Sequence, residues 1–301
     1  MTAQTSRLFD NYYFAHGCGQ PYARDAGWQA HFGRIADGIM AELQPQSVLD
    51  VGCAIGLLVE ALRARGVEAY GVDVSEYAIG QVHPSIRPFC RVHQATEPFG
   101  RRYDLIICIE VLEHLPPEQA QPAVANFCRH ADSVLFSSSP FDYVELTHFN
   151  VQPPDYWAKL FAQQGFYRDV DLDAGFLTPW AACFRRRSDP PAAVVADYER
   201  RHWLMLQESR ARLQLNLQQR EQLAALEQEV AALRKTAAAA PGAVAEAQAL
   251  RARLDAIDHS AGGRLLATLQ RMRATVAPPG SLRDRALESI LRRIAGREQG
   301  A

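Results

Sequence analysis

The sequence lacks the patterns that mark several classes of protein. Its six cysteines form no C-x-x-C pair, which argues against a zinc knuckle or a redox dithiol. No apolar run reaches the roughly 18 residues that a membrane span needs. The first thirty residues hold no basic stretch followed by an apolar one, as a secretion signal would. These absences favour a reduced, cytoplasmic protein.

The chain also lacks an excess of charge of one sign. It has 32 basic and 34 acidic residues and a net charge of −2, which argues against a broad nucleic-acid surface. Its hydrophobic content of 48% and charged content of 22% are those of a globular protein. The 301 residues leave room for one α/β domain and a further segment.

A strand followed by a glycine turn organises the chain. The apolar run from Ser47 to Val51 leads into a turn that contains Gly52 and Gly56 and opens a helix. Such a turn places free backbone N–H groups at the carboxyl end of a strand, where open α/β sheets bind ligands. The next strand, Glu68 to Asp73, ends in an acid that can accept the hydroxyls of a ribose. We therefore expect a nucleoside-type cofactor.

The spacing of the glycines distinguishes two cofactors. Counted from Gly52, the second and third glycine positions of a dinucleotide fingerprint hold Ala54 and Leu57, so that fingerprint is incomplete. The pattern of Asp50, Gly52 and Gly56 instead resembles motif I of the class I S-adenosylmethionine (SAM) methyltransferases. Because alanine tolerates positive φ angles poorly, we expect Ala54 to keep a negative φ.

Helical and strand patterns alternate through the first 187 residues. The periodicity predicts helices over 31–43, 56–65, 118–130 and 154–164, one more capped by Ser75, and strands over 47–51, 68–73, 88–92, 103–109, 133–137, 166–172 and 180–185. This alternation indicates an α/β, Rossmann-like, doubly wound fold. The last two strands suit an antiparallel hairpin, and the resemblance then implies a seven-stranded sheet of order 3-2-1-4-5-7-6.

Further motifs extend the resemblance to residues 46–186. Asp73 matches the acid that binds the ribose, and Gln94 and Ala95 match the loop that frames the adenine. The run from Tyr103 to Leu115 is similar to motif IV of the ubiquinone O-methyltransferases, within methyltransferase types 11 and 23. The resemblance implies SAM as cofactor and these cofactor-binding residues: Asp50, Gly52, Cys53, Ala54, Gly56, Asp73, Val74, Gln94, Ala95 and Ile109.

Methyl transfer to a hydroxyl is helped by a base that takes the proton. His114 is the first candidate and His148 the second, and Glu110 completes the predicted catalytic set. Together with Glu113, these residues could instead hold a divalent metal. We predict no metal, because the same motif occurs in relatives that show no metal use.

The start of the chain differs from the methyltransferase domain predicted over 31–187. Residues 1–30 are rich in aromatics, and we predict a lid in which Tyr13, Tyr22 and Arg24 close over the cofactor or shape the acceptor pocket. The alternative is a segment that only packs on the domain. The stretch from Gly17 to Trp28 resembles a leader of bacterial methyltransferases associated with surface polysaccharides.

The end of the chain is polar and helical. Within 195–258, Leu223, Leu226, Val230 and Leu233 keep the 3-4-3 spacing of a coiled coil, and a second seam runs from 247 to 257. Self-association is the favoured interpretation, and a helix folded back on its own domain is the alternative. Residues 259–301 form basic amphipathic helices that could contact an anionic membrane or a glycosyltransferase complex, or remain solvated.

Together these patterns predict a SAM-dependent O-methyltransferase. The resemblance of the leader and of the C-terminal tail implies a sugar or glycan acceptor in bacterial surface polysaccharide biosynthesis. The enzyme would be cytoplasmic, at most peripheral to the inner membrane, and would have no nucleic-acid partner. The alternatives are an acceptor that is a small phenolic or quinone-like molecule, and a catalytically idle scaffold organised by the coiled coil.

Overall fold

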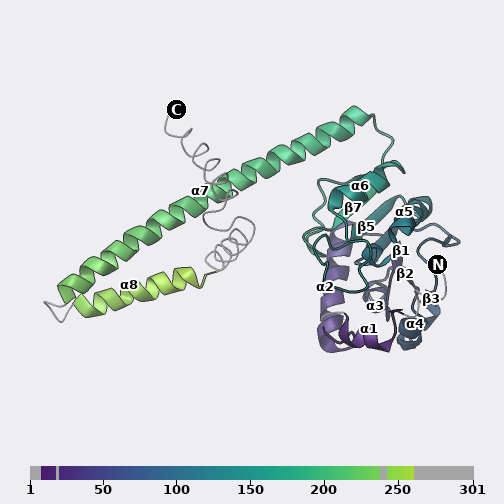
Figure 1. The fold of residues 1–301 in the computed structure, drawn as a ribbon, viewed down its shortest axis with the longest axis horizontal. Helices are drawn as coiled ribbons and strands as arrows, with labels where there is room; N and C mark the ends of the chain where they lie inside the picture. The colour runs from purple at the N-terminus through teal and green to yellow at the C-terminus, as the bar shows by residue number, and fades with distance from the viewer. Residues whose placement is uncertain (1–7, 18–19, 238–242, 261–301) are drawn as a thin grey trace. The chain divides into compact units, whose positions relative to one another are not determined.

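A computed structural model describes residues 8–17, 20–237 and 243–260 (Figure 1). The chain divides into two units, residues 1–201 and 202–301. Most of the predicted basic helices of 259–301 lie outside the described residues. Within the described ranges, no helix has the length and apolarity needed to cross a membrane.

The first unit is built on a seven-stranded sheet of order β3-β2-β1-β4-β5-β7-β6, which confirms the predicted order. The strands are β1 Ser47–Val51, β2 Glu68–Asp73, β3 Cys90–Val92, β4 Leu105–Ile109, β5 Ser133–Ser137, β6 Phe166–Arg168 and β7 Ala182–Arg186. Strands β1 to β5 are parallel, and β7 runs antiparallel to both of its neighbours. The carboxyl ends of β1, β2 and β4 therefore meet at one edge.

Helices cover both faces of this sheet (Figure 1). They are α1 Asn11–His16, α2 Ala26–Glu42, α3 Leu57–Arg63, α4 Glu76–Gln81, α5 Pro117–His130 and α6 Pro154–Ala162. On one face, Ile39 of α2 and Leu62 of α3 lie in a buried cluster with β1 and β4. On the other, Phe127 of α5 and Phe161 of α6 lie in a second cluster. This layering is that of a doubly wound fold.

Several predicted boundaries differ from the structure. Helix α2 begins at Ala26 rather than at residue 31, because the Asp25 side chain caps it by accepting the backbone N–H of Trp28 at 2.9 Å. Strand β6 ends at Arg168 rather than at residue 172. Strand β7 begins at Ala182, so Trp180 lies in the loop before it.

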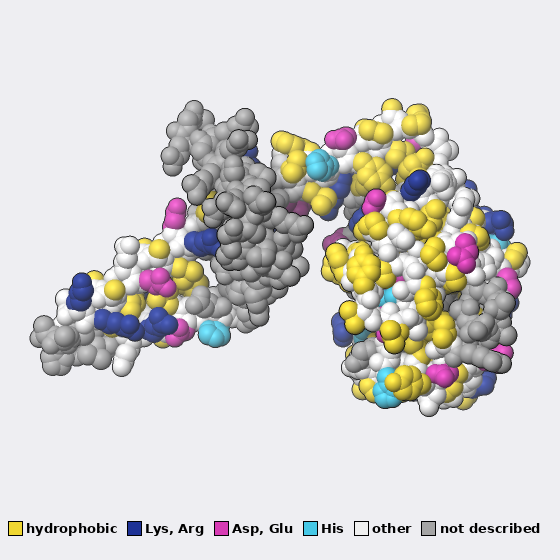
Figure 2. All heavy atoms as spheres, in the orientation of Figure 1, with side chains coloured by type: hydrophobic (Ala, Val, Ile, Leu, Met, Phe, Trp, Pro, Cys, Tyr) yellow, Lys and Arg dark blue, Asp and Glu magenta, His cyan; other side chains and the backbone are white. Residues whose placement is uncertain are grey.

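The long helix α7, Pro191–Ala237, is followed by α8, Ala243–Asp258. The two predicted seams pack on each other within the chain: Val230 of α7 is buried with Leu250 and Leu254 of α8, and α8 runs back beside the end of α7 (Figure 1). Upstream on α7, hydrophobic side chains stay exposed (Figure 2), among them Trp203, Leu206 and Leu217. A helix with such a stripe gains stability from a partner.

We propose that this upstream stripe pairs with a second copy of the chain. The full chain is then expected to be a dimer or larger by size-exclusion chromatography with light scattering. The double change Leu206→Glu and Leu217→Glu should give a monomer, because it places two charges in the stripe. As a control, Gln207→Glu and Gln218→Glu add the same charge beside the stripe and should leave the mass unchanged. A monomeric native chain would contradict the proposal.

Candidate active site

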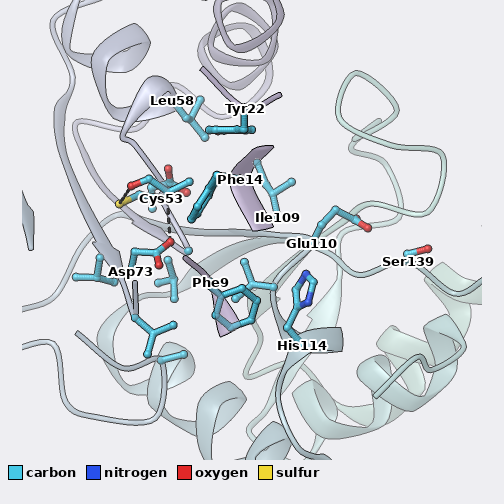
Figure 3. A pocket seen from close by; sticks show the side chains of 18 of the residues that line it. Phe9, Phe14, Tyr22, Cys53, Leu58, Asp73, Ile109, Glu110, His114 and Ser139 are labelled. Atoms are coloured by element: carbon cyan, nitrogen blue, oxygen red, sulfur yellow. Dashed lines mark hydrogen bonds between the residues drawn. The ribbon is translucent and has the colours of Figure 1, made fainter. Parts of the chain in front are cut away.

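A cavity of about 580 Å³ lies at the carboxyl ends of β1, β2 and β4. Figure 3 shows Asp73 at one end and Glu110, His114 and Ser139 at the other. All but one of the residues predicted for the site line this cavity: Asp50, Gly52, Cys53, Ala54, Asp73, Val74, Gln94, Ala95, Ile109, Glu110, His114 and His148. Its volume is in the range of a small-molecule site.

Gly56 is the predicted residue that does not line the cavity. It precedes α3 with a φ of 79°, which favours glycine. A Cβ at this position would lie 2.8 Å from Ile86 and 3.2 Å from the sulfur of Cys90. Gly56 therefore lets α3 approach its neighbours closely, and its contribution to the cavity is indirect.

The turn after β1 adopts left-handed backbone angles. Gly52 has a φ of 82°, and a Cβ there would collide with Val111. Ala54 has a φ of 50°, so the prediction of a negative φ was wrong. In this conformation the Ala54 N–H donates to Oδ2 of Asp73 at 2.8 Å. The hydrogen bond to a carboxylate offsets the cost of the unusual backbone angle.

Two acids form one end of the cavity, Asp50, which is buried, and Asp73, which is partly buried. Oδ1 of Asp73 accepts the backbone N–H of Ser75 at 2.8 Å, so each oxygen of this carboxylate is oriented by one amide and keeps lone-pair capacity for a ligand. Burial raises the pKa of Asp73 against the opposing effect of these hydrogen bonds. Burial, and then the charge of Asp73, raises the pKa of Asp50 to about 8.

A chain of polar groups forms the other end. Nδ1 of His114 lies 2.9 Å from Oγ1 and 3.2 Å from the carbonyl oxygen of Thr147, and the Thr147 hydroxyl donates to Glu145 at 3.1 Å. Because a carbonyl oxygen only accepts, Nδ1 carries the hydrogen. Nε2 is therefore an acceptor, 3.4 Å from the Tyr13 hydroxyl.

His114 is held neutral in this chain. Burial, and then the neighbouring His148, lowers the pKa of the His114 imidazole to about 4. The two rings lie 4.5 Å apart, centroid to centroid. Nδ1 of His148 donates to the Asp142 carbonyl oxygen at 2.8 Å. The structure thus brings both predicted histidines together at the cavity wall.

Glu110 lies beside them in a strained conformation, with a φ of 51°. Its Oε1 accepts the indole N–H of Trp180 at 3.0 Å. Behind it, Glu113 is fully buried and accepts the backbone N–H of Ser139 at 3.0 Å. Burial, and then the charge of Glu110, raises the pKa of Glu113 to about 8. Within the described part of the chain, no three His, Cys, Asp or Glu side chains form a metal-binding group.

The structure places aromatic side chains of the N-terminal segment at the cavity, whereas the action of residues 1–30 as a lid stays a prediction. Phe9, Tyr13, Phe14 and Tyr22 line the cavity, and Figure 3 shows Phe9 and Phe14 between its two ends. The Ser75 hydroxyl fixes the segment by donating to the Phe9 carbonyl oxygen at 2.5 Å. Arg24, also predicted here, instead pairs with Glu60 and does not line the cavity.

The match to a family of known proteins agrees with this geometry. Residues 28–169 match the family model described as a methyltransferase domain. The seven-stranded sheet of the first unit, whose strand β7 lies beyond this match, has the class I, Rossmann-like topology of the SAM-dependent methyltransferases.

Curated relatives of the methyltransferase domain are O-methyltransferases. Over 108 residues the chain is 37% identical to the ubiquinone biosynthesis O-methyltransferase of an Azoarcus species, a match that spans 32% of this chain and 45% of the relative. Over 111 residues it is 31% identical to the magnesium-protoporphyrin O-methyltransferase of a Synechocystis species, spanning 35% and 47%. The chain thus spans about half the length of the curated relatives it matches.

Known structures also resemble the methyltransferase domain. The SAM-bound magnesium protoporphyrin IX methyltransferase of Synechocystis is 20% identical, with a TM-score of 0.45 that covers 60% of this chain and 95% of that one. A sugar N-methyltransferase of a Streptoalloteichus species is 16% identical, with a TM-score of 0.41 that covers 59% and 92%.

Sequence patterns missed several residues that line the cavity of the methyltransferase domain. Trp180 and Thr178 come from the loop before β7, and Trp28 and His31 come from the start of α2. Trp180 was placed in a strand and His31 at the start of a helix, which gave no signal for a ligand site. The capping residue Asp25, three positions before Trp28, was the available signal for the earlier helix start.

The raised pKa of Asp50 makes stability depend on pH. The folded chain holds a proton up to about pH 8 that the unfolded chain loses near pH 4, so stability falls as the pH rises between these values. Asp50→Asn removes this titrating group, so the variant should not lose stability in this way as the pH rises. Relative to the native chain without ligand, we expect the Tm of the variant to rise more at pH 8 than at pH 5, by on the order of 5 °C, as measured by thermal unfolding. The exposed control Asp155→Asn should show no such difference, and equal gains of Asp50→Asn at both pH values would contradict the assignment.

Proposed function

We propose that the chain is a SAM-dependent O-methyltransferase whose acceptor is a sugar or glycan intermediate of bacterial surface polysaccharide synthesis. The observation that carries the activity is the cavity itself, which has an oriented carboxylate, that of Asp73, at one end and a neutral histidine, His114, at the other. The glycan acceptor is supported by the resemblance of the leader and tail sequences to methyltransferases of that class.

The residues at the Asp73 end fit SAM. The Asp73 oxygens keep lone pairs that can accept two ribose hydroxyls, and Gln94 and Ala95 line the wall beside them, where an adenine would lie. The Asp73 carboxylate supplies negative charge near the cationic groups of the cofactor. When bound, SAM supplies a methyl group on a sulfonium, which is already activated for transfer.

The protein must then orient the acceptor and take its proton. At the end of the cavity away from Asp73, Nε2 of His114 offers a lone pair that can accept this proton. The Tyr13 hydroxyl lies next to it. A base whose conjugate acid has a pKa near 4 is too weak to deprotonate an ordinary hydroxyl before methyl transfer begins. The hydroxyl becomes strongly acidic as its oxygen gains a carbon bond, so that such a base suffices late in the transfer. Thr147 and Glu145 hold the imidazole in the required tautomer.

A second acceptor class is favoured by a specific observation. Aromatic side chains of Tyr22, Trp28, Phe32 and Trp180 line the cavity, and planar acceptors stack well on such rings. The similarity to a ubiquinone biosynthesis O-methyltransferase points the same way. A small phenolic or quinone-like acceptor is therefore the alternative.

Binding of SAM tests the donor site. Isothermal titration calorimetry should show one SAM per chain, and Asp73→Asn should weaken binding by 10- to 100-fold, because it removes the charge and one of the two acceptor oxygens. The exposed control Asp155→Asn should bind as the native chain does. An absence of SAM binding to the native chain would overturn the proposal.

Kinetics test the base. His114→Gln should lower kcat by about 10²- to 10⁴-fold, measured as transfer of a labelled methyl group, and Tyr13→Phe should lower it less. SAM affinity should change little in either variant, because both side chains lie at the end away from Asp73. A His114→Gln variant with native kcat would exclude His114 as the base.

A further inference from the structure

The walls of the cavity are one-sided in charge. Four acids line it, Asp50 and Asp73 at the cofactor end and Glu110 and Asp142 at the acceptor end. No lysine or arginine lines it anywhere in the described part of the chain. A pocket that receives a phosphate or a carboxylate ordinarily presents a cation or a set of oriented N–H donors to it.

The acidic character of the acceptor end is fixed by packing. Oε1 of Glu110 is held by the Trp180 indole at 3.0 Å. Glu113 lies behind it without exposure, and among the described residues its Oε2 has no hydrogen-bond partner. The Trp180 indole thus orients Glu110 as an acceptor at the cavity wall.

His114 does not compensate for this charge. Its Nδ1 donates toward Thr147, so its Nε2 is an acceptor. Nδ1 of His148 donates to the Asp142 carbonyl oxygen. The guanidinium of Arg24 pairs with Glu60 at 2.6 Å and does not line the cavity. SAM carries a sulfonium and an ammonium together with a carboxylate, so it would add one net positive charge, at the Asp73 end.

We infer that the part of the acceptor that enters the cavity is an uncharged, hydroxyl-bearing group, and that Glu110 selects against acceptors with a carboxylate or phosphate there. This inference rests on the proposed function and narrows it. A glycan acceptor would enter by a neutral sugar, and any phosphate or uronic acid it carries would remain outside. An acceptor hydroxyl would donate to Glu110, whereas an anion would face it without a counter-ion.

Matched pairs of small acceptors test this inference. The full chain is loaded with S-adenosylhomocysteine, and binding is measured by saturation-transfer NMR near pH 7. The pairs are catechol with protocatechuate, and methyl glucoside with methyl glucuronide, and within each pair the second member adds one carboxylate. We expect the neutral member of at least one pair to bind at least tenfold more tightly than its anionic partner. Equal affinities, tighter binding of the anion, or no binding of either neutral compound would overturn the inference.

Two variants test the role of Glu110. Glu110→Gln keeps the size of the side chain and should reduce the preference for the neutral compound over the anionic one to less than threefold. The exposed control Glu118→Gln should keep the native preference. An undiminished preference in Glu110→Gln would remove Glu110 as the selecting residue. Failure to load with S-adenosylhomocysteine would contradict the proposed function instead, and the pairs are then measured on the unloaded chain, so that the charge preference is scored in either case.

Discussion

The site depends on one hydrogen bond, from the backbone N–H of Ala54 to Oδ2 of Asp73. It ties the turn after β1 to the end of β2 and holds Ala54 in a left-handed conformation that alanine rarely adopts. A second amide, that of Ser75, orients the other oxygen. The Ser75 hydroxyl in turn fixes Phe9, so the carboxylate, the turn and the N-terminal segment form one connected unit.

The opposite end of the cavity is organised by hydrogen bonds of another kind. The series of hydrogen bonds from Glu145 through Thr147 to His114 fixes which nitrogen of the imidazole carries the hydrogen. The nitrogen without a hydrogen, Nε2, lies beside the Tyr13 hydroxyl. Tyr13 belongs to the same N-terminal segment that Ser75 fixes. The Asp73 end and the His114 end of the cavity are thereby connected through the N-terminal segment as well as through the sheet.

The motif resemblance predicted the sheet order, and nearly all of the site residues that it predicted line the cavity, because parallel strands bring their carboxyl ends to one edge. The φ of Ala54 could not be predicted in this way, since it depends on a partner 19 residues away. Trp180 was missed because its contact with Glu110 joins two loops 70 residues apart. Such contacts follow from the packed structure and leave no local pattern.

We propose that this cavity transfers a methyl group to a neutral hydroxyl of a surface glycan. The most direct measurement is mass spectrometry of purified surface polysaccharide from strains with and without the protein. We expect the deletion strain to lose an O-methyl group from one sugar residue and the native chain to restore it, whereas His114→Gln should not. Identical O-methylation in both strains would contradict the glycan acceptor.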